Sequence, residues 1–378
     1  MTKTNSMTIR PPAKTATTLP GRERPASRSP WIDPEAAYAP RPPDARASLY
    51  LDANEGRPLP AALERLRSAS PTDLCRYPST GRLEAELARR WDVDARRVVV
   101  CAGADDALSR VCAIRLAPGA RLLAFAPAFA MVRQWARTRG AQDSYLSWPE
   151  NSAFPLAAAL DLAERCPSLG LALVASPANP TGEAPDTADV YALADACRSS
   201  GTAFVLDAAY AEFADADASA GLVQDGSAFV ARTFSKAYGL AGLRVGYVIA
   251  PDARDAAAIR AAGSPYPCSG LALDLALASL ADDAGLAAAV DRVRLEPSAL
   301  RSALLSRGAR VSASQANFVF ARLADAAGFS AALADCGVAV RAFGSTPGLA
   351  DAVRIGCPCD TLAFDRLMGA IESAGSYI

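Results

Sequence analysis

The 378-residue sequence contains no histidine. Serine- and cysteine-based catalysis with a histidine base is therefore excluded, and so are metal sites with imidazole ligands. Lysine is also scarce, because 36 of the 39 basic residues are arginines and only three are lysines. Two of these, Lys3 and Lys14, lie in the first residues of the chain, so that Lys236 is the only lysine in all that follows.

Long apolar runs and a large excess of one charge are absent as well. No apolar run reaches the length of a membrane-spanning helix, and the N-terminal residues lack the apolar core of a signal peptide. The net charge of −1 gives no concentrated basic face for nucleic acid or for an acidic membrane. We therefore expect a soluble, cytoplasmic protein that binds small molecules, with no nucleic acid and no membrane among its partners.

The nine cysteines indicate neither a disulfide framework nor a metal site. Their number is odd and they are scattered along the chain, which is typical of reduced thiols in a cytoplasm. Cys357 and Cys359 form a CPC motif whose spacing is too short for the usual zinc pair, and no second pair accompanies it. We expect no bound metal.

The pattern along the chain indicates an α/β fold. Residues 1–47 are rich in Pro, Arg, Ser and Thr, and are predicted to form a disordered or surface-lying arm. From SLYLDANE onward, short apolar runs alternate with helical segments rich in Ala, Leu and Arg. The clearest runs are 121–127, 171–177, 203–210, 228–235 and 245–251. Such alternation predicts a mainly parallel sheet covered by helices on both faces.

The last part of the chain has a different pattern. A helical stretch over about 285–307 leads to shorter strands at NFVFARL, VAVRAF and VRIGC, interspersed with helices, which predicts a smaller α+β domain. We predict that residues 48–75 form the N-terminal part of this small domain. Residues 76–284 are predicted to form the large domain, and residues 285–378 the C-terminal part of the small domain.

Polar residues gather where the predicted strands of the large domain end. In parallel α/β sheets, ligands bind beyond the carboxyl ends of the strands. The residues at these ends are Gly103, Ala104 and Asp105, the segment SPANPTG over 176–182, Asp207 with Tyr210, then Thr233, Ser235 and Lys236, followed by Arg244. We expect them to surround one ligand.

Lys236 differs chemically from the arginines that replace lysine almost everywhere else. A desolvated lysine amine loses its proton and becomes a nucleophile, whereas a guanidinium stays charged. The hydroxyls of Thr233 and Ser235, the guanidinium of Arg244 and the free amides of a helix beginning at Ala104 suit a phosphate group. The pattern therefore indicates a phosphate held beside a reactive amine.

Pyridoxal phosphate meets these demands together. Its aldehyde forms an imine with a lysine, here Lys236, and a carboxylate such as Asp207 keeps its pyridine nitrogen protonated. Asn179 and Tyr210 are placed to bond the ring hydroxyl, and Phe129 to stack on the ring. Each residue alone has an ordinary interpretation, as a helix cap, a turn residue or a core aromatic, but their combination in this order favours the cofactor.

The motifs SPANPTG, VLDAAYAEF and TFSKAYGLAGLRVGY resemble those of the pyridoxal phosphate-dependent aminotransferases of fold type I, most closely the histidinol-phosphate aminotransferase group. The resemblance extends from LDANE to the C-terminus and includes RYPSTGRLEAELA, CAGADDAL, SQANFVFAR and VRAFGSTPGLADAVRIG. It implies a large domain with a seven-stranded type of sheet, a smaller α+β domain, and a homodimer with shared active sites.

Transferred position by position, the resemblance makes Lys236 the Schiff-base lysine and proton shuttle, and Asp207 the partner of the pyridinium. Asn179 and Tyr210 are expected on the ring hydroxyl. The phosphate is expected against Thr233, Ser235, Arg244, the amides near Ala104 and Asp105 and, from the neighbouring subunit, Tyr77.

The resemblance also implies where a substrate binds. Arg354 is expected to bind its carboxylate, Arg341 to help hold its far end, and Asn54 to lie in the segment that lines the pocket. This segment departs from the family pattern, because Asn54-Glu55 runs into GRPLP, which is shorter, has no aromatic residue and adds Arg57 as a further positive charge. Two smaller departures, Ala208 for an acidic residue and Phe129 for a tyrosine, remove no step of the chemistry.

The predicted function is amino-group transfer between an L-amino acid or amino phosphate and a 2-oxo acid. One alternative keeps the cofactor but breaks another bond, as in the threonine-phosphate decarboxylases or in other lyases and oxidases of this scaffold. A second alternative is a non-enzymatic binding module, against which the intact pair Lys236 and Asp207 argues.

Overall fold

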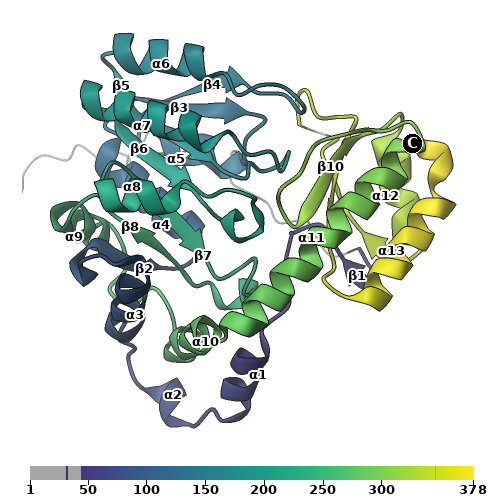
Figure 1. The fold of residues 1–378 in the computed structure, drawn as a ribbon, viewed down its shortest axis with the longest axis horizontal. Helices are drawn as coiled ribbons and strands as arrows, with labels where there is room; N and C mark the ends of the chain where they lie inside the picture. Colours follow the sequence, from purple (N-terminus) through teal and green to yellow (C-terminus); the bar gives the residue numbers. More distant parts are fainter. Residues whose placement is uncertain (1–30, 33–43, 345) are drawn as a thin grey trace, which may run out of the picture.

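The computed structural model describes residues 31–32, 44–344 and 346–378. The predicted arm, residues 1–47, therefore lies almost entirely outside the described residues. The described chain folds into two parts, each built on its own sheet, with a long helix running between them (Figure 1).

The larger part contains a seven-stranded sheet with the order β2-β8-β7-β6-β5-β3-β4. Its strands are β2 Val98–Cys101, β3 Arg121–Ala126, β4 Gln142–Ser147, β5 Leu169–Ala175, β6 Ala203–Asp207, β7 Phe229–Thr233 and β8 Gly246–Ile249. Neighbours run parallel except at β8, which is antiparallel to both β2 and β7. The predicted mainly parallel sheet is confirmed. The apolar runs do not predict β4, because QDSYLS is largely polar, as a strand at the edge of a sheet permits.

Helices cover both faces of this sheet. One apolar core contains side chains of α3 Gly81–Trp91, α6 Leu156–Arg165, α7 Thr187–Ser200, α8 Ser219–Asp225 and α10 Gly270–Leu280. The other contains side chains of α4 Ala104–Arg115, α5 Ala130–Arg137 and α9 Ala253–Ala261. Within β2, Val98 and Val100 enter the first core, whereas Val99 and Cys101 enter the second. Burial on both faces explains why these strands are apolar without alternation.

The smaller part contains a four-stranded antiparallel sheet with the order β12-β13-β10-β9. Its strands are β9 Arg310–Val311, β10 Phe318–Arg322, β12 Arg341–Ala342 and β13 Ala352–Gly356, and its helices are α12 Ala326–Asp335 and α13 Thr361–Ser373. The prediction of one strand at VAVRAF is wrong. The segment is divided between β11 Val338–Ala339, which pairs with β1 Leu49–Tyr50, and β12, which pairs with β13. The distant partner β1 cannot be identified from local periodicity.

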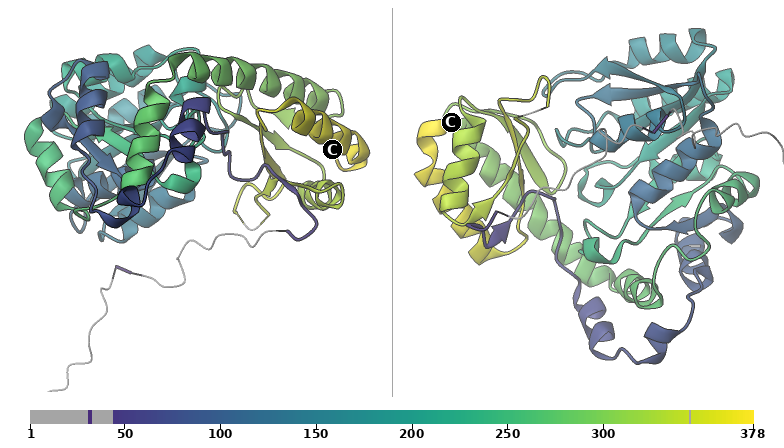
Figure 2. Two further views of the ribbon diagram at one scale, coloured as in Figure 1. Left: turned by 90° about the horizontal axis from the view of Figure 1, so that it is seen from below. Right: turned by 180° about the vertical axis from the view of Figure 1, so that it is seen from behind.

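The helix α11 Asp283–Leu305 contributes to both parts (Figure 2). Val293 packs with Tyr210 and Phe213 of the larger part, whereas Leu300 and Leu304 lie in the core of the smaller one. Near the N-terminus, β1 joins the smaller part, while α1 Pro60–Arg67 packs on α10 and is followed by α2 Thr72–Cys75. Short 3-10 turns lie at Ala95–Arg97, Ala211–Phe213, Ala241–Leu243 and Gly375–Tyr377. The predicted domain boundaries stay a prediction.

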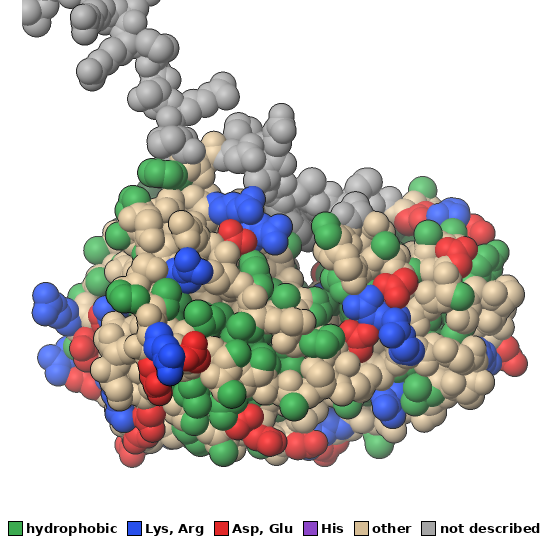
Figure 3. Space-filling view, turned by 90° about the horizontal axis from the view of Figure 1, so that it is seen from above, with side chains coloured by type: hydrophobic (Ala, Val, Ile, Leu, Met, Phe, Trp, Pro, Cys, Tyr) green, Lys and Arg blue, Asp and Glu red, His purple; other side chains and the backbone are tan. Residues whose placement is uncertain are grey.

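On the face seen in Figure 3, basic side chains (blue) and acidic side chains (red) lie close to one another, and neither kind forms a large patch by itself. A membrane-spanning helix is also missing, since none of the helices in the described residues has the necessary combination of length and apolar character.

Candidate active site

A cavity of about 540 Å³ lies at the carboxyl ends of the large sheet's strands and is closed on one side by the smaller part. Twelve of the predicted site residues line it, namely Ala104, Asp105, Phe129, Asn179, Asp207, Tyr210, Thr233, Ser235, Lys236, Arg244, Arg341 and Arg354. The topology therefore brings together groups that are up to 250 positions apart in the sequence. Their roles stay predictions.

Lys236 lies three residues beyond the end of β7, in the turn that precedes β8. Its Nζ donates a hydrogen bond to the carbonyl of Ala53 at 2.9 Å and lies 5.5 Å from the centre of the Tyr210 ring. The segment that contains Ala53 passes directly over the lysine turn, because a Cβ atom at Gly56 would lie only 1.9 Å from the Lys236 carbonyl oxygen. Glycine at position 56 is thus required for this close passage.

Hydroxyl, guanidinium and amide donors converge at one end of the cavity. Thr233 Oγ1 donates to Ser235 Oγ at 2.9 Å, and Arg244 Nη1 donates to the same oxygen at 3.4 Å. Gly103, the N-cap of α4, has φ +85°, and a Cβ atom there would lie 2.6 Å from Arg244 Nη2. The glycine therefore lets the guanidinium approach the positive end of the helix, which makes a cradle for a phosphate.

Asp207 ends β6 at the floor of the cavity. Burial and the charge of Asp105 raise the pKa of the Asp207 carboxyl to about 7, although the Ala209 amide and Lys236 act in the opposite direction. A partly buried carboxyl with a raised pKa is stabilised in its charged form by a cationic partner. A protonated pyridine nitrogen is such a partner, so Asp207 and the phosphate cradle both fit pyridoxal phosphate.

Arg354, in β13, connects the two parts of the molecule inside the cavity. Its Nη1 donates to Asn179 Oδ1 at 2.7 Å, and its Nη2 donates to the carbonyl of Asp52 at 2.6 Å. The side chain of Asn54 is buried behind this layer, where its Nδ2 donates to the Tyr210 hydroxyl at 3.1 Å. Asn54 is thus placed to hold Tyr210, one layer away from the cavity lining.

Tyr77 and Arg57 lie outside the cavity lining. Tyr77 is 84% exposed and its ring stacks on Tyr266, with centroids 4.6 Å apart. Arg57 pairs with Asp360 at 3.0 Å. The further positive charge that Arg57 adds to this segment is therefore paired with a carboxylate of the smaller part.

Several lining residues were not predicted from the sequence. They are Asp52, Glu55, Trp148, Phe343, Thr346 and Leu349. Trp148 follows the polar edge strand β4, and Phe343, Thr346 and Leu349 come from an irregular segment between β12 and β13. Neither region has a periodicity that indicates a site, although Glu55 directly follows Asn54 in the motif LDANE.

Comparison with known proteins points to the same class of enzyme as the residues that line this cavity. The family model for aminotransferase class I and II matches residues 47–371. A histidinol-phosphate aminotransferase from Halorubrum lacusprofundi is 34% identical over 320 residues, which cover 83% of this chain and 85% of that protein. An aromatic amino acid aminotransferase from Thermobifida fusca is 34% identical over 336 residues, which cover 85% of this chain and 89% of that protein.

A solved structure shares the fold. The histidinol-phosphate aminotransferase of Sinorhizobium meliloti, solved in complex with pyridoxal 5'-phosphate, superposes with a TM-score of 0.81 at 24% identity and covers 93% of this chain and 98% of that one. The family model spans most of the chain, and two relatives at 34% identity are covered over 85% and 89% of their length. This chain belongs to the aminotransferase class I and II family.

Proposed function

We propose that this aminotransferase exchanges the amino group of an L-amino acid or amino phosphate with a 2-oxo acid, and that the substrate carries a polar or anionic end. Membership of the family confirms the predicted reaction class and the predicted cofactor, pyridoxal 5'-phosphate. The observation that carries the proposal is that one cavity contains the Lys236 amine, the Asp207 carboxyl and the cradle at Arg244.

The cofactor, when bound, supplies an electron sink for the bonds of the substrate α-carbon. The protein residues position it and move protons. Thr233, Ser235 and Arg244 hold its phosphate, and Asp207 keeps its ring nitrogen protonated. The Lys236 amine, held by the Ala53 carbonyl beside the Tyr210 ring, accepts and returns the proton of the α-carbon.

Arg354 is the proposed site of the substrate α-carboxylate. A guanidinium binds a carboxylate through two parallel hydrogen bonds and so fixes its orientation. The bonds from Arg354 to Asn179 and to the Asp52 carbonyl hold the fork in the cavity. The α-carbon of a bound substrate is thereby directed toward the lysine.

Arg341 is proposed to bind the far end of the substrate. Its guanidinium lies 5.9 Å from the centre of the Phe343 ring, and no carboxylate among the described residues forms an ion pair with it. Phe129, Trp148 and Leu349 add apolar lining to the cavity. A phosphate, a second carboxylate or another polar group beyond an apolar middle fits these walls.

The active site is proposed to be shared in a homodimer, with Tyr77 bonding the phosphate bound to the other subunit. In support, Tyr77 and Tyr266 form an exposed stacked pair, and Leu63 and Leu66 of α1 and Leu74 of α2 are exposed as well. Exposed large apolar side chains that gather on a surface mark interaction sites. The nine cysteines are all free thiols, which supports the proposed cytoplasmic location.

One experiment tests both chemistry and substrate. Borohydride treatment of the purified, cofactor-loaded protein is expected to fix a pyridoxyl group on the peptide containing Lys236, and on no other. In a separate sample of the cofactor-loaded protein that has not been treated with borohydride, amino acids and amino phosphates are added singly, and the products are analysed. A 2-oxo product with the amino group transferred to the cofactor supports the proposal. Release of carbon dioxide instead identifies a decarboxylase, and a preference for neutral aliphatic amino acids contradicts the polar end.

A further inference from the structure

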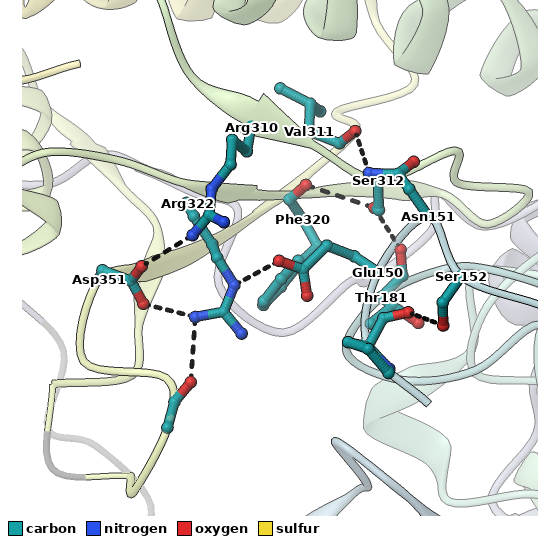
Figure 4. A network of polar contacts seen from close by, with 12 residues as sticks. Glu150, Asn151, Ser152, Thr181, Arg310, Val311, Ser312, Phe320, Arg322 and Asp351 are labelled. Atoms are coloured by element: carbon teal, nitrogen blue, oxygen red, sulfur yellow. Dashed lines mark hydrogen bonds and ion pairs between the residues drawn. The ribbon is translucent and has the colours of Figure 1, made fainter. Parts of the chain in front are cut away.

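A partly buried ion cluster outside the cavity joins the turn after β4 to the smaller part (Figure 4). Arg322, the last residue of β10, donates from Nε to Glu150 Oε1. Its Nη1 donates to Asp351 Oδ1 at 2.6 Å and to the carbonyl of Gly348 at 3.0 Å. The side chains of Arg322 and Glu150 are only 15% and 9% exposed, so this is a largely desolvated contact between residues 172 positions apart.

The two sides of this cluster lie close in sequence to cavity-lining residues, one from the larger part and one from the smaller part. Glu150 follows Trp148 by two residues, and Trp148 lines the cavity from the larger part. Gly348 and Asp351 belong to residues 346–351, here called the wall segment, whose Thr346 and Leu349 line the cavity from the smaller part. Arg322 therefore connects the backbone behind one wall to the backbone behind the other.

The wall segment has no regular secondary structure of its own. Its turns are closed by bonds from the Leu349 amide to the Thr346 carbonyl and from the Ala352 amide to the Leu349 carbonyl, both 3.0 Å. Gly348 adopts φ +75°, which is typical of a tight turn. A short irregular segment of this type depends on external contacts for a single conformation, and Arg322 supplies two of them.

Arginine is the residue type that this cluster needs. Burial alone lowers the pKa of Arg322, but Glu150 and Asp351 outweigh it, and the pKa lies above its usual value. The planar fork reaches two carboxylates and one carbonyl at once, which a lysine ammonium does with poorer geometry. Glu150 Oε2 has no hydrogen-bond partner among the described residues, so loss of Arg322 leaves a buried carboxylate unpaired.

We propose that Arg322 is a positioning residue for the substrate: by binding Glu150 and the wall segment together, it holds Thr346 and Leu349 over the cavity. The inference rests on the proposed function, since the cavity is taken as the substrate site. Arg322 does not touch the reacting atoms. Its contribution to binding is made equally in the ground state and in the transition state, so it acts on KM and leaves kcat nearly unchanged.

The test compares Arg322→Gln with Arg310→Gln. Arg310 is a matched control, because its guanidinium approaches the same Asp351 at 3.6 Å but is 72% exposed, and among the described residues the ion pair of Glu150 is with Arg322. Hydrogen exchange in the protein without substrate is expected to rise several-fold over residues 346–352 in Arg322→Gln, and to stay as in the wild type in Arg310→Gln. With the best substrate, KM is expected to rise about tenfold in Arg322→Gln with kcat within about threefold.

Two further variants separate positioning from a general loss of structure. Glu150→Gln keeps the size of the side chain and is expected to raise both the exchange over 346–352 and KM. The double variant Glu150→Gln with Arg322→Gln is expected to show the same exchange and the same KM as Arg322→Gln alone, because both changes remove the same contact. Arg322→Lys is expected to have a KM between that of the wild type and that of Arg322→Gln.

The inference is overturned if exchange over 346–352 stays at the wild-type level in Arg322→Gln, or if exchange rises there while KM does not change. Equal effects of Arg310→Gln overturn it too, as does a fall of kcat with faster exchange throughout the chain. A wild-type protein without aminotransferase activity contradicts the proposed function instead, and the exchange data alone then decide whether Arg322 holds the wall segment.

Discussion

The guanidinium of Arg354 lies 2.7 Å from the side-chain oxygen of Asn179, so that a strand of the small sheet meets the turn after β5 of the large sheet inside the cavity. Both residues have proposed roles in the site, one on the substrate and one on the cofactor ring. The contact therefore links the proposed substrate subsite to the proposed cofactor subsite.

Replacing Arg354 by Gln is expected to lower kcat/KM by at least about thirtyfold, since loss of one partner of a buried charged contact costs about 2–5 kcal/mol. Steady-state kinetics with an α-amino acid measures the loss. The corresponding amine without the α-carboxylate serves as the control, because its slow reaction does not use the clamp. Equal rates of the wild type and Arg354→Gln with the amino acid would show that the carboxylate binds elsewhere.

Asp207 is expected to make the cofactor-free protein less stable as the pH rises from about 4 to about 7. The pKa of its carboxyl is raised from 3.8 to about 7 in the folded chain. Between these two values the folded state binds more protons than the unfolded state, so the free energy of unfolding falls with increasing pH and levels off above about 7. Above that pH, the partly buried charge is unfavourable, and at about 1.4 kcal/mol per pKa unit the raised pKa sets an upper limit of a few kcal/mol on this cost.

Asp207→Asn provides the measurement. Urea unfolding of the cofactor-free proteins is expected to show that the variant gains stability relative to the wild type at pH 8 but not at pH 4. Addition of cofactor should reverse the order at pH 8, because only the carboxylate pairs with a protonated ring nitrogen. A difference between the two proteins that does not vary with pH would rule out Asp207 as the titrating group.

Tyr77 is expected to act in the active site of a partner subunit. Tyr77→Phe and Lys236→Ala are each expected to lower activity, Lys236→Ala by about 10²–10⁴-fold if its main loss is proton transfer. Mixed and reassembled subunits should recover activity, because each hybrid dimer contains one site free of both changes. Sedimentation velocity checks the assembly, and a fully active monomer would contradict the shared site.

Much of the large sheet and the chemistry of the site follow from local sequence. Strands β2, β3, β5, β6, β7 and β8 are apolar runs because helices bury them on both faces, and this burial leaves a direct signal in the composition. The polar residues that follow these runs meet at one edge for a topological reason, since parallel strands end on the same side of a sheet. Lys236, Asp207 and Arg244 were therefore predicted to share a cavity, and they line the same one.

The contacts that only the tertiary structure determines are between polar or irregular segments far apart in the chain. Glu150 forms an ion pair with Arg322, Arg57 forms one with Asp360, and Leu49 pairs with Val338 in a two-stranded sheet. None of these segments has a regular spacing of apolar residues that predicts its place in the fold. In a sequence with 36 arginines, an acidic side chain also has many possible ion-pair partners, and the sequence does not distinguish among them. Which of them meet depends on how the smaller part packs on the larger one, because burial strengthens an ion pair only where the fold has removed water from both partners.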